Sequence, residues 1–421
     1  MQNNMIAAAH AVNSGVSETN IWEKSYPAGL TWNSKVDVAP VYDILNSAVA
    51  QFAARPAIYF EGLSLTYAEL GALSDKVAAG LQKLGVGKGV KVGLFMPNTH
   101  YSVAFYYGIL KSGATVVNYN PLYVERELEF QIGDSETDYM VTLDMPAMFD
   151  KANNVLRNTR LKGIIVCPSG AADAVNASGE SYIHYKDLIA NEGSFAAPVI
   201  NPQDDIAVLQ YTGGTTGTPK GAMLTHANLY ANAVQIEQWH SPLAVPGEER
   251  IIGAIPLFHV FSMTVVMNMA LKMGMEVILV PKFDPEQFIA LLKEKKPTFF
   301  PAVPTIFNAL AVHPAGEGLD LSFVKFCLSG GAPLPQGIKD AFERRTGATL
   351  GEGYGLTEAS PVVCCNPTKG KVKVGTIGLP IPGTMVEIID MEDGVTPLAQ
   401  GAKGEVCVSG PQVMKGYYNK P

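Results

Sequence analysis

IAVLQYTGGTTGTPKGAMLTH, residues 206–226, joins a run of apolar residues to a loop of very different composition. From Tyr211 to His226 the chain contains four glycines, five threonines and one lysine, Lys220. The apolar run predicts a buried strand, and a helix is expected to begin near Thr225. The stretch therefore predicts a strand, a glycine-rich loop and a helix in succession, which is the kind of unit from which α/β folds are built.

Similar strand and helix patterns recur on both sides of this stretch. Helices are predicted at 65–85, where apolar residues are spaced by three and four, and at 284–296, where Asp284 is a candidate N-cap and Pro285 occupies the first turn. The alternation predicts an α/β fold with mostly parallel sheets and right-handed crossovers. Further strands are predicted at 91–96, 114–120, 139–143, 163–167, 276–280, 298–303 and 323–330.

Composition divides the chain into four segments. Residues 1–36 form an alanine-rich N-terminal extension. Residues 37–204 and 205–365 are predicted to be two α/β subdomains that pack against each other, the second carrying the glycine-rich loop. Residues 366–421 contain strand-like runs broken by Gly, Pro and Asp, which predicts a small β-barrel subdomain.

The bulk composition limits the possible partners and compartments. The chain of 421 residues has a formal net charge of −8 and no run of lysine or arginine, so a nucleic acid partner is not expected. Its five cysteines show no zinc-ligand spacing, and its start lacks the pattern of a signal peptide. We therefore expect a cytoplasmic protein.

One segment, residues 251–271, contains no Asp, Glu, Lys or Arg and is long enough to cross a bilayer. Pro256 and polar residues such as His259 and Asn268 interrupt it, and polar groups are costly in lipid. A buried strand, a loop and a buried helix are predicted instead. Contact with the inner membrane is expected to be peripheral at most.

The glycine-rich loop has the composition of an anion-binding site. Glycines allow consecutive backbone N–H groups to converge on one point, threonine hydroxyls add donors, and Lys220 adds a positive charge. These groups favour a polyphosphate ligand over a solvated surface loop. The loop is not a Walker A motif, because in that motif the lysine opens the helix, whereas Lys220 follows Pro219 and precedes Gly221.

Two further stretches are ambiguous when each is taken alone. LSGGAPL, residues 328–334, permits close approach of the backbone to a flat ligand, but a plain strand-to-helix turn explains it equally well. In IPLFHVFSM, residues 255–263, His259 lies in an apolar run. A lone histidine in such a run is usually a core residue with satisfied hydrogen bonds.

A third stretch, GEGYGLTEASP at 351–361, carries side chains suited to a nucleotide. Tyr354 lies between two glycines, where its ring has room to stack on a base. Thr357 and Glu358 offer a hydroxyl and a carboxylate close together, which suits Mg²⁺ beside substrate phosphates. A solvated glutamate would be the default interpretation of Glu358 without the other motifs.

Taken in order, these motifs resemble those of the adenylate-forming superfamily, which comprises acyl-CoA synthetases, luciferases and peptide-synthetase adenylation domains. The resemblance covers about residue 40 to the end and includes the tail GEVCVSGPQVMKGYYNKP. The segments 113–136 and 374–384 are similar to the long-chain fatty acid–CoA ligase branch in particular. The resemblance implies that the chain is the large N-terminal domain of such a ligase.

The resemblance also implies roles for individual residues of this sequence. Lys220, Glu358 and Thr212 are expected to act in catalysis, with Glu358 and Thr212 as magnesium ligands and Phe258 and His259 at the wall of the acyl pocket. The expected ATP contacts are Thr212, Gly213, Gly214, Thr215, Thr216, Gly217 and Lys220 for the phosphates, and Gly330, Gly331, Ala332, Pro333, Gly353, Tyr354, Gly355 and Thr357 for the rest of the nucleotide.

The sequence departs from the family pattern at its end. After Pro421 the family pattern continues with a threonine–glycine–aspartate motif, a hinge and a small C-terminal domain that carries a catalytic lysine. None of these is in the sequence given. We therefore expect this chain to bind ATP and an acyl substrate but to turn over slowly.

The implied reaction is activation of a fatty acid by ATP, with Mg²⁺ as cofactor and release of pyrophosphate, followed by transfer to CoA in the full-length enzyme. An aryl- or dicarboxylic acid–CoA ligase is the alternative within the superfamily, and a peptide-synthetase adenylation domain fits less well. A non-catalytic nucleotide- or acyl-binding module and an ADP-forming phosphotransferase are alternatives of other classes. A homodimer is compatible with the sequence, which leaves the oligomeric state open.

Overall fold

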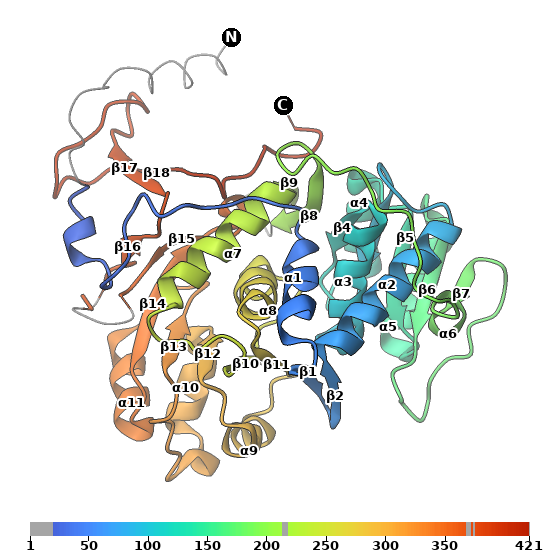
Figure 1. Cartoon of the computed structure of the whole chain (residues 1–421), viewed down its shortest axis with the longest axis horizontal. Coiled ribbons are helices and arrows are strands. Elements are labelled where there is room, and N and C mark those ends of the chain that lie inside the picture. Colours follow the sequence, from blue (N-terminus) through green and yellow to red (C-terminus); the bar gives the residue numbers. More distant parts are fainter. Residues whose placement is uncertain (1–19, 213–217, 368–371, 374, 421) are drawn as a thin grey trace.

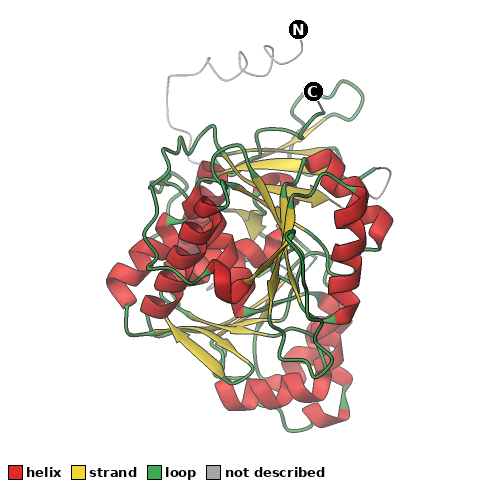
Figure 2. Ribbon diagram, turned by 90° about the vertical axis from the view of Figure 1, so that its right-hand side faces the viewer, coloured by secondary structure: helices red, strands yellow, loops and turns green. Residues whose placement is uncertain are grey.

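The computed structural model of the chain describes residues 20–212, 218–367, 372–373 and 375–420 (Figure 1). Strands and helices alternate along most of this length, and the strands form two large sheets. Helices pack around the sheets, as Figure 2 shows. This arrangement confirms the predicted α/β fold with mostly parallel sheets.

The first large sheet has seven strands in the order β7-β6-β5-β3-β4-β8-β9. Its paired neighbours are parallel except for β8 and β9. The strands predicted between residues 91 and 211 are all present. The strands are β3 (Lys91–Leu94), β4 (Thr115–Asn118), β5 (Tyr139–Leu143), β6 (Gly163–Cys167), β7 (Tyr182–His184), β8 (Ile206–Thr212) and β9 (Lys220–Thr225).

The second large sheet has nine strands in the order β16-β15-β14-β13-β12-β10-β11-β1-β2. Its centre is parallel, and antiparallel pairs lie at both edges. The strands predicted at 276–280, 298–303 and 323–330 are confirmed. The strands are β1 (Pro56–Phe60), β2 (Leu63–Thr66), β10 (Arg250–Gly253), β11 (Glu276–Leu279), β12 (Phe299–Ala302), β13 (Phe326–Ser329), β14 (Leu350–Gly355), β15 (Val362–Cys365) and β16 (Leu379–Pro380).

Each sheet takes strands from both halves of the sequence. In the nine-stranded sheet, Ile58 of β1 is paired with Val277 of β11. In the seven-stranded sheet, Val116 of β4 is paired with Val208 of β8. A boundary between residues 204 and 205 does not separate the sheets, because each sheet contains strands from both sides of it. The division into four segments stays a proposal.

The helices begin and end at residues that suit those positions. α2 has a capping box of Thr66 and Glu69, and α9 has Asp284 as its N-cap with Pro285 next, as predicted. The α-helices are α1 (Asp43–Phe52), α2 (Tyr67–Lys83), α3 (His100–Ser112), α4 (Glu125–Ser135), α5 (Pro146–Asn158), α6 (Tyr185–Leu188), α7 (His226–His240), α8 (Ala270–Lys272), α9 (Pro285–Lys295), α10 (Pro304–Val312) and α11 (Gln336–Thr346). The short 3₁₀ turns are η2 (Glu23–Ser25), η4 (Pro314–Gly316) and η5 (Thr357–Ala359).

The apolar segment 251–271 folds as predicted into a buried strand, a loop and buried helix. β10 is followed by a π-helix, η3 (Ser262–Met269), and then by α8. The polar side chains of η3 are satisfied inside the protein: Thr264 donates to the carbonyl of Ser360 at 2.6 Å, and the Asn268 amide pairs with two tyrosine hydroxyls. No helix within the described ranges has both the length and the apolar character needed to cross a membrane.

The C-terminal part contains strands but no helix between residues 375 and 420. A small barrel was expected over 366–421; in the part that the structure describes, β16 extends the nine-stranded sheet, and β17 (Met385–Ile389) pairs antiparallel with β18 (Glu405–Ser409). The end of the N-terminal extension packs here. The Trp32 indole donates to the carbonyl of Thr384 at 2.8 Å.

One apolar core joins the two sheets. A single cluster of buried side chains includes Val92 and Val116 from the seven-stranded sheet and Ile251 and Val277 from the nine-stranded sheet. Because close-packed interiors deform little, this shared core fixes the two sheets relative to each other. The edges where the strands end are therefore held in place.

His226, the first residue of α7, is buried and neutral. Its Nδ1 accepts a hydrogen bond from the backbone N–H of Val41 at 3.0 Å, so this nitrogen carries no proton. Burial lowers the pKa of His226 from 6.5 to about 4, although the nearby Asp205 opposes this effect. Its place at a helix N-terminus also disfavours a positive charge.

We predict that acid destabilises the fold through His226. The unfolded chain binds a proton below about pH 6.5, while the folded chain does so only below about pH 4, so stability is lost as the pH falls through this window. From pH 7.5 to pH 5 the loss is about 2 kcal/mol. Urea unfolding of His226→Gln should show a smaller loss than the unaltered chain. His184→Gln, at a partly exposed position in β7, should leave the loss unchanged.

Candidate active site

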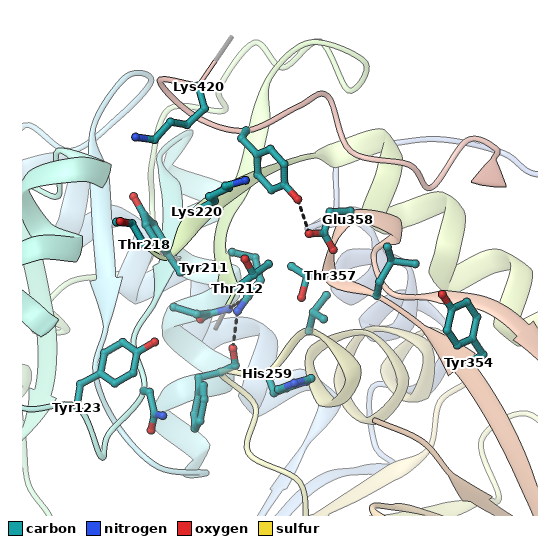
Figure 3. A pocket seen from close by; sticks show the side chains of 17 residues that line it. Tyr123, Tyr211, Thr212, Thr218, Lys220, His259, Tyr354, Thr357, Glu358 and Lys420 are labelled. Atoms are coloured by element: carbon teal, nitrogen blue, oxygen red, sulfur yellow. Dashed lines mark hydrogen bonds between the residues drawn. The ribbon is translucent and has the colours of Figure 1, made fainter. Parts of the chain in front are cut away.

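A cavity of about 1360 Å³ opens where strands of both sheets end (Figure 3). β4, β8 and β9 reach it from one sheet, and β14 and the segment after β10 reach it from the other. Ligands of open parallel sheets bind outside the carboxyl ends of strands. The lining residues are Asn118, Asn120, Tyr123, Gln210, Tyr211, Thr212, Thr218, Lys220, Phe258, His259, Val260, Tyr354, Leu356, Thr357, Glu358, Tyr417 and Lys420.

The antiparallel pair of β8 and β9 brings Thr212 and Lys220 to this cavity. The two residues are paired at the end of the ladder where β8 ends and β9 begins. The five predicted phosphate contacts between them, Gly213, Gly214, Thr215, Thr216 and Gly217, lie outside the described residues. Lys220 begins a strand, and α7 follows only after Thr225, which agrees with the prediction that this is not a Walker A loop. The strand between the loop and the helix was not predicted.

Two buried amides hold the loop that carries Phe258 and His259. Asn98, which follows β3, donates to the carbonyls of residues 253 and 255 and accepts from the N–H of residue 257. Gln210 of β8 donates to the carbonyl of Phe258 at 2.9 Å and accepts from Asn118 at 2.9 Å. Side chains of the seven-stranded sheet thus fix a loop of the nine-stranded sheet. Phe258 and His259 both line the cavity, and their role at an acyl pocket stays a prediction.

His259 is exposed to the cavity although protein atoms surround much of its ring. This partial desolvation lowers the pKa of His259, so the ring is neutral near pH 7. Its Nδ1 accepts from the N–H of Phe261 at 3.3 Å, which leaves the proton on Nε2. A neutral ring with one N–H donor beside Phe258 suits a wall for a partly apolar substrate.

Thr357 and Glu358 lie in η5, directly after β14. In Figure 3, Thr212, Lys220, Thr357 and Glu358 surround the same space, while Tyr354 lies farther away. The lysine and the carboxylate therefore face one cavity from different sheets. The sequence alone placed them in separate motifs.

A smaller cavity of about 210 Å³ adjoins the first and shares His259, Tyr354 and Thr357 with it. Most of the residues predicted to contact the adenosine meet here. Those that line it are Gly330, Gly331, Gly353, Tyr354, Gly355 and Thr357. Ala332 and Pro333 are exposed and line neither of these cavities, so their contacts stay a prediction.

Several lining residues were missed by sequence reasoning. Asn118 and Asn120 lie at the C-terminal end of the predicted strand 114–120, and the rule that sites lie at carboxyl ends of parallel strands would have found them. Gln210 was inside a predicted strand. Tyr417 and Lys420 come from the tail 404–421, which was part of the resemblance but gave no role to either residue.

The donor set fits a magnesium ion that is held partly by substrate. Among the residues that the structure describes, no three His, Cys, Asp or Glu side chains are grouped to hold a metal. Glu358 is a single carboxylate with the Thr357 and Thr212 hydroxyls lining the same cavity. Mg²⁺ is commonly bound by one or two carboxylates together with phosphates and water. Glu358 and Thr212 would hold it here.

Comparison with known proteins gives consistent matches over nearly the whole chain. The model of a family described as AMP-binding enzyme matches residues 45–418. A long-chain fatty acid–CoA ligase of Bacillus subtilis is 41% identical over 420 residues, covering 95% of this chain and 74% of that protein. One from Escherichia coli is 37% identical over 426 residues, covering 95% and 75%. The crystal structure of a long-chain fatty acid–CoA ligase from Archaeoglobus fulgidus has a TM-score of 0.83 at 27% identity, covering 94% of this chain and 78% of that chain.

The smaller cavity generates a prediction about Gly355. A Cβ at this position would lie 2.2 Å from the carbonyl oxygen of Pro361, an overlap with backbone that side chains cannot relieve. We expect Gly355→Ala to lower the free energy of unfolding by about 1–3 kcal/mol. Gly337→Ala in α11 is the matched control, because a Cβ there meets nothing within 4 Å. It should raise stability by about 0.5–1 kcal/mol. Equal urea midpoints for the two variants would show that Gly355 is not required for packing.

Proposed function

We propose that this chain, which belongs to the AMP-binding enzyme family, activates a long-chain fatty acid as an acyl-adenylate that serves thioester formation with CoA. The matched relatives are AMP-forming acid–CoA ligases. The observation that carries the proposal is the cavity in which Lys220 and Glu358 meet an apolar wall at Phe258 and Val260. Charged groups suit the nucleotide, and the wall suits the acyl chain.

The chemistry requires charge neutralisation more than a protein nucleophile. A carboxylate is a poor electrophile, and its negative charge is repelled by the phosphates of ATP. Attack of a carboxylate oxygen on the α-phosphorus forms the acyl–phosphate bond and breaks the bond to pyrophosphate. Lys220, which lines the cavity, is the residue proposed to stabilise the charge that develops on the phosphates. The thiol of CoA then attacks the acyl carbon, and AMP leaves.

The remaining residues orient the reactants. When bound, Mg²⁺ supplies further neutralisation of the phosphates, and Glu358 and Thr212 are the residues proposed to hold it. Tyr354 and the glycines of the smaller cavity leave room for a flat base. Phe258 and the neutral His259 form the side of the cavity that receives the acid.

A single-turnover assay on this chain tests the proposal directly. The chain at high concentration is mixed with magnesium-ATP and one acid from a panel of C8–C18 fatty acids, aryl acids and dicarboxylic acids. We expect acyl-adenylate and an equal amount of pyrophosphate with the fatty acids. Adenylate only from aryl or dicarboxylic acids would change the substrate class. Formation of ADP would indicate a phosphotransferase, and binding of ATP without adenylate would indicate a binding module.

Substitutions of the two charged residues should lower the rate of this step. Lys220→Ala is expected to reduce it by about 10²-fold, because a preorganised charge at the phosphates is lost. Glu358→Gln should lower it by a similar factor and raise the Mg²⁺ concentration needed. Lys403→Ala and Glu392→Gln alter exposed charges outside both cavities and serve as controls. Wild-type rates in both test variants would show that these residues are wrongly assigned.

A further inference from the structure

The C-terminal segment 414–420, here called the strap, lies beside β9. Met223 donates its N–H to the carbonyl of Gly416 at 2.9 Å and accepts from the N–H of Lys415 at 3.0 Å. The N–H of Tyr418 donates to the carbonyl of Gly221 at 2.8 Å. The strap thus continues the sheet beyond its edge strand, and its position is fixed by backbone hydrogen bonds.

The strap is also hydrogen-bonded to the turn that carries Glu358. The N–H of Met414 donates to the backbone carbonyl of Glu358 at 2.7 Å. Just before the strap, the Asn228 amide of α7 donates to the carbonyls of Pro411 and Val413 at 2.9 Å each. One short segment therefore connects β9, which begins with Lys220, to η5, which contains Glu358.

Tyr417 of the strap contacts both charged residues of the cavity. Its hydroxyl donates to Oε1 of Glu358 at 2.6 Å, a bond shown as a dashed line in Figure 3. The Nζ of Lys220 lies 5.1 Å from the centre of its ring, within the range of a cation–π interaction. The ring and hydroxyl of one side chain thus hold the lysine and the carboxylate.

Tyr417 stays protonated while it holds Glu358. Burial, followed by the hydrogen bond and the charge of Glu358, raises the pKa of Tyr417 to about 12. The residue is therefore a neutral donor near pH 7 and adds no negative charge beside the phosphates. A bond to Oε1 alone leaves the second carboxylate oxygen, Oε2, able to bind a cation.

We propose that Tyr417 is a positioning residue that orients Glu358 for magnesium and Lys220 for the phosphates. The inference rests on the proposed function, because it assigns Tyr417 to the same ATP site. It also gives the strap a role: residues 414–420 help to build the side of the cavity that contains Glu358. A tyrosine that merely packed there would affect stability without any dependence on magnesium.

The neighbouring tyrosine provides a matched control. The Tyr418 hydroxyl donates to Oε2 of Glu136 at 2.6 Å, and Lys91 lies 4.9 Å from the centre of its ring. Both tyrosines lie on the strap, and each contacts one glutamate and one lysine. Lys91 differs from Lys220 in that it also forms an ion pair with its glutamate, at 3.0 Å. Tyr418, Glu136 and Lys91 line neither of the two cavities. Tyr418→Phe therefore loosens the strap to a similar degree without touching the site.

The test is calorimetric titration of ATP into this chain, with magnesium and then with EDTA. With magnesium, Tyr417→Phe should weaken ATP binding by about tenfold, the effect of a hydrogen bond to a charged group. Tyr417→Leu should weaken it by about two- to fivefold more, because the ring facing Lys220 is lost. Tyr418→Phe should stay within about twofold of the unaltered chain. In EDTA, Tyr417→Phe should bind ATP as the unaltered chain does.

Combining Tyr417→Phe with Glu358→Gln isolates the contact. If the tyrosine acts through the carboxylate, the double variant should bind magnesium-ATP no more weakly than Glu358→Gln alone. Urea midpoints of all variants check folding. Equal affinities of Tyr417→Phe and Tyr418→Phe would overturn the positioning role while leaving the proposed function intact, and tighter binding by Tyr417→Phe would show that the tyrosine competes with the metal. Failure of the unaltered chain to bind magnesium-ATP would instead refute the proposed function.

Discussion

The antiparallel pairing of β8 with β9 is the constraint on which the site depends. Its register sets Thr212 opposite Lys220, and both residues line the cavity. The same pairing makes β9 the edge of the seven-stranded sheet. An edge strand has unpaired backbone groups that another segment can cover. Here the strap covers them and thereby delivers Tyr417 to the cavity.

The second requirement is that the two sheets do not move relative to each other. A shared apolar core holds the two sheets together. Buried amide side chains also connect them close to the cavity. Asn98 and Gln210 extend from one sheet to the loop of the other, and their partners are backbone groups that would otherwise be buried without hydrogen bonds. The π-helix η3 follows that loop directly, and such helices are frequent at functional sites. The cavity is thus largely preformed.

The electrostatics of the cavity follow from this frame. Lys220 and Glu358 carry opposite charges, but within the described residues no ion pair joins them; each contacts Tyr417 instead. Both charges therefore remain available to ligands of opposite sign. The neutral tyrosine contacts both the lysine and the carboxylate. The lysine is thus left to bind a polyphosphate and the carboxylate to bind magnesium.

The sequence by itself determined the class of fold and most of the chemistry. Continuous apolar runs such as 163–167 become central strands because both faces of a parallel sheet are buried, and Asp284 and Pro285 start a helix for local reasons of capping and geometry. The glycines and threonines beside Lys220 indicated an anion site, because their hydrogen-bond donors and the lysine charge are local features of the sequence. Only the tertiary structure decided that β1 pairs with the distant β11, that Glu358 and Lys220 line one cavity, and that Tyr417 contacts both. Those outcomes depend on which strand edges pair and how two sheets share a core, and the energies of such long-range contacts leave no periodic trace in the chain.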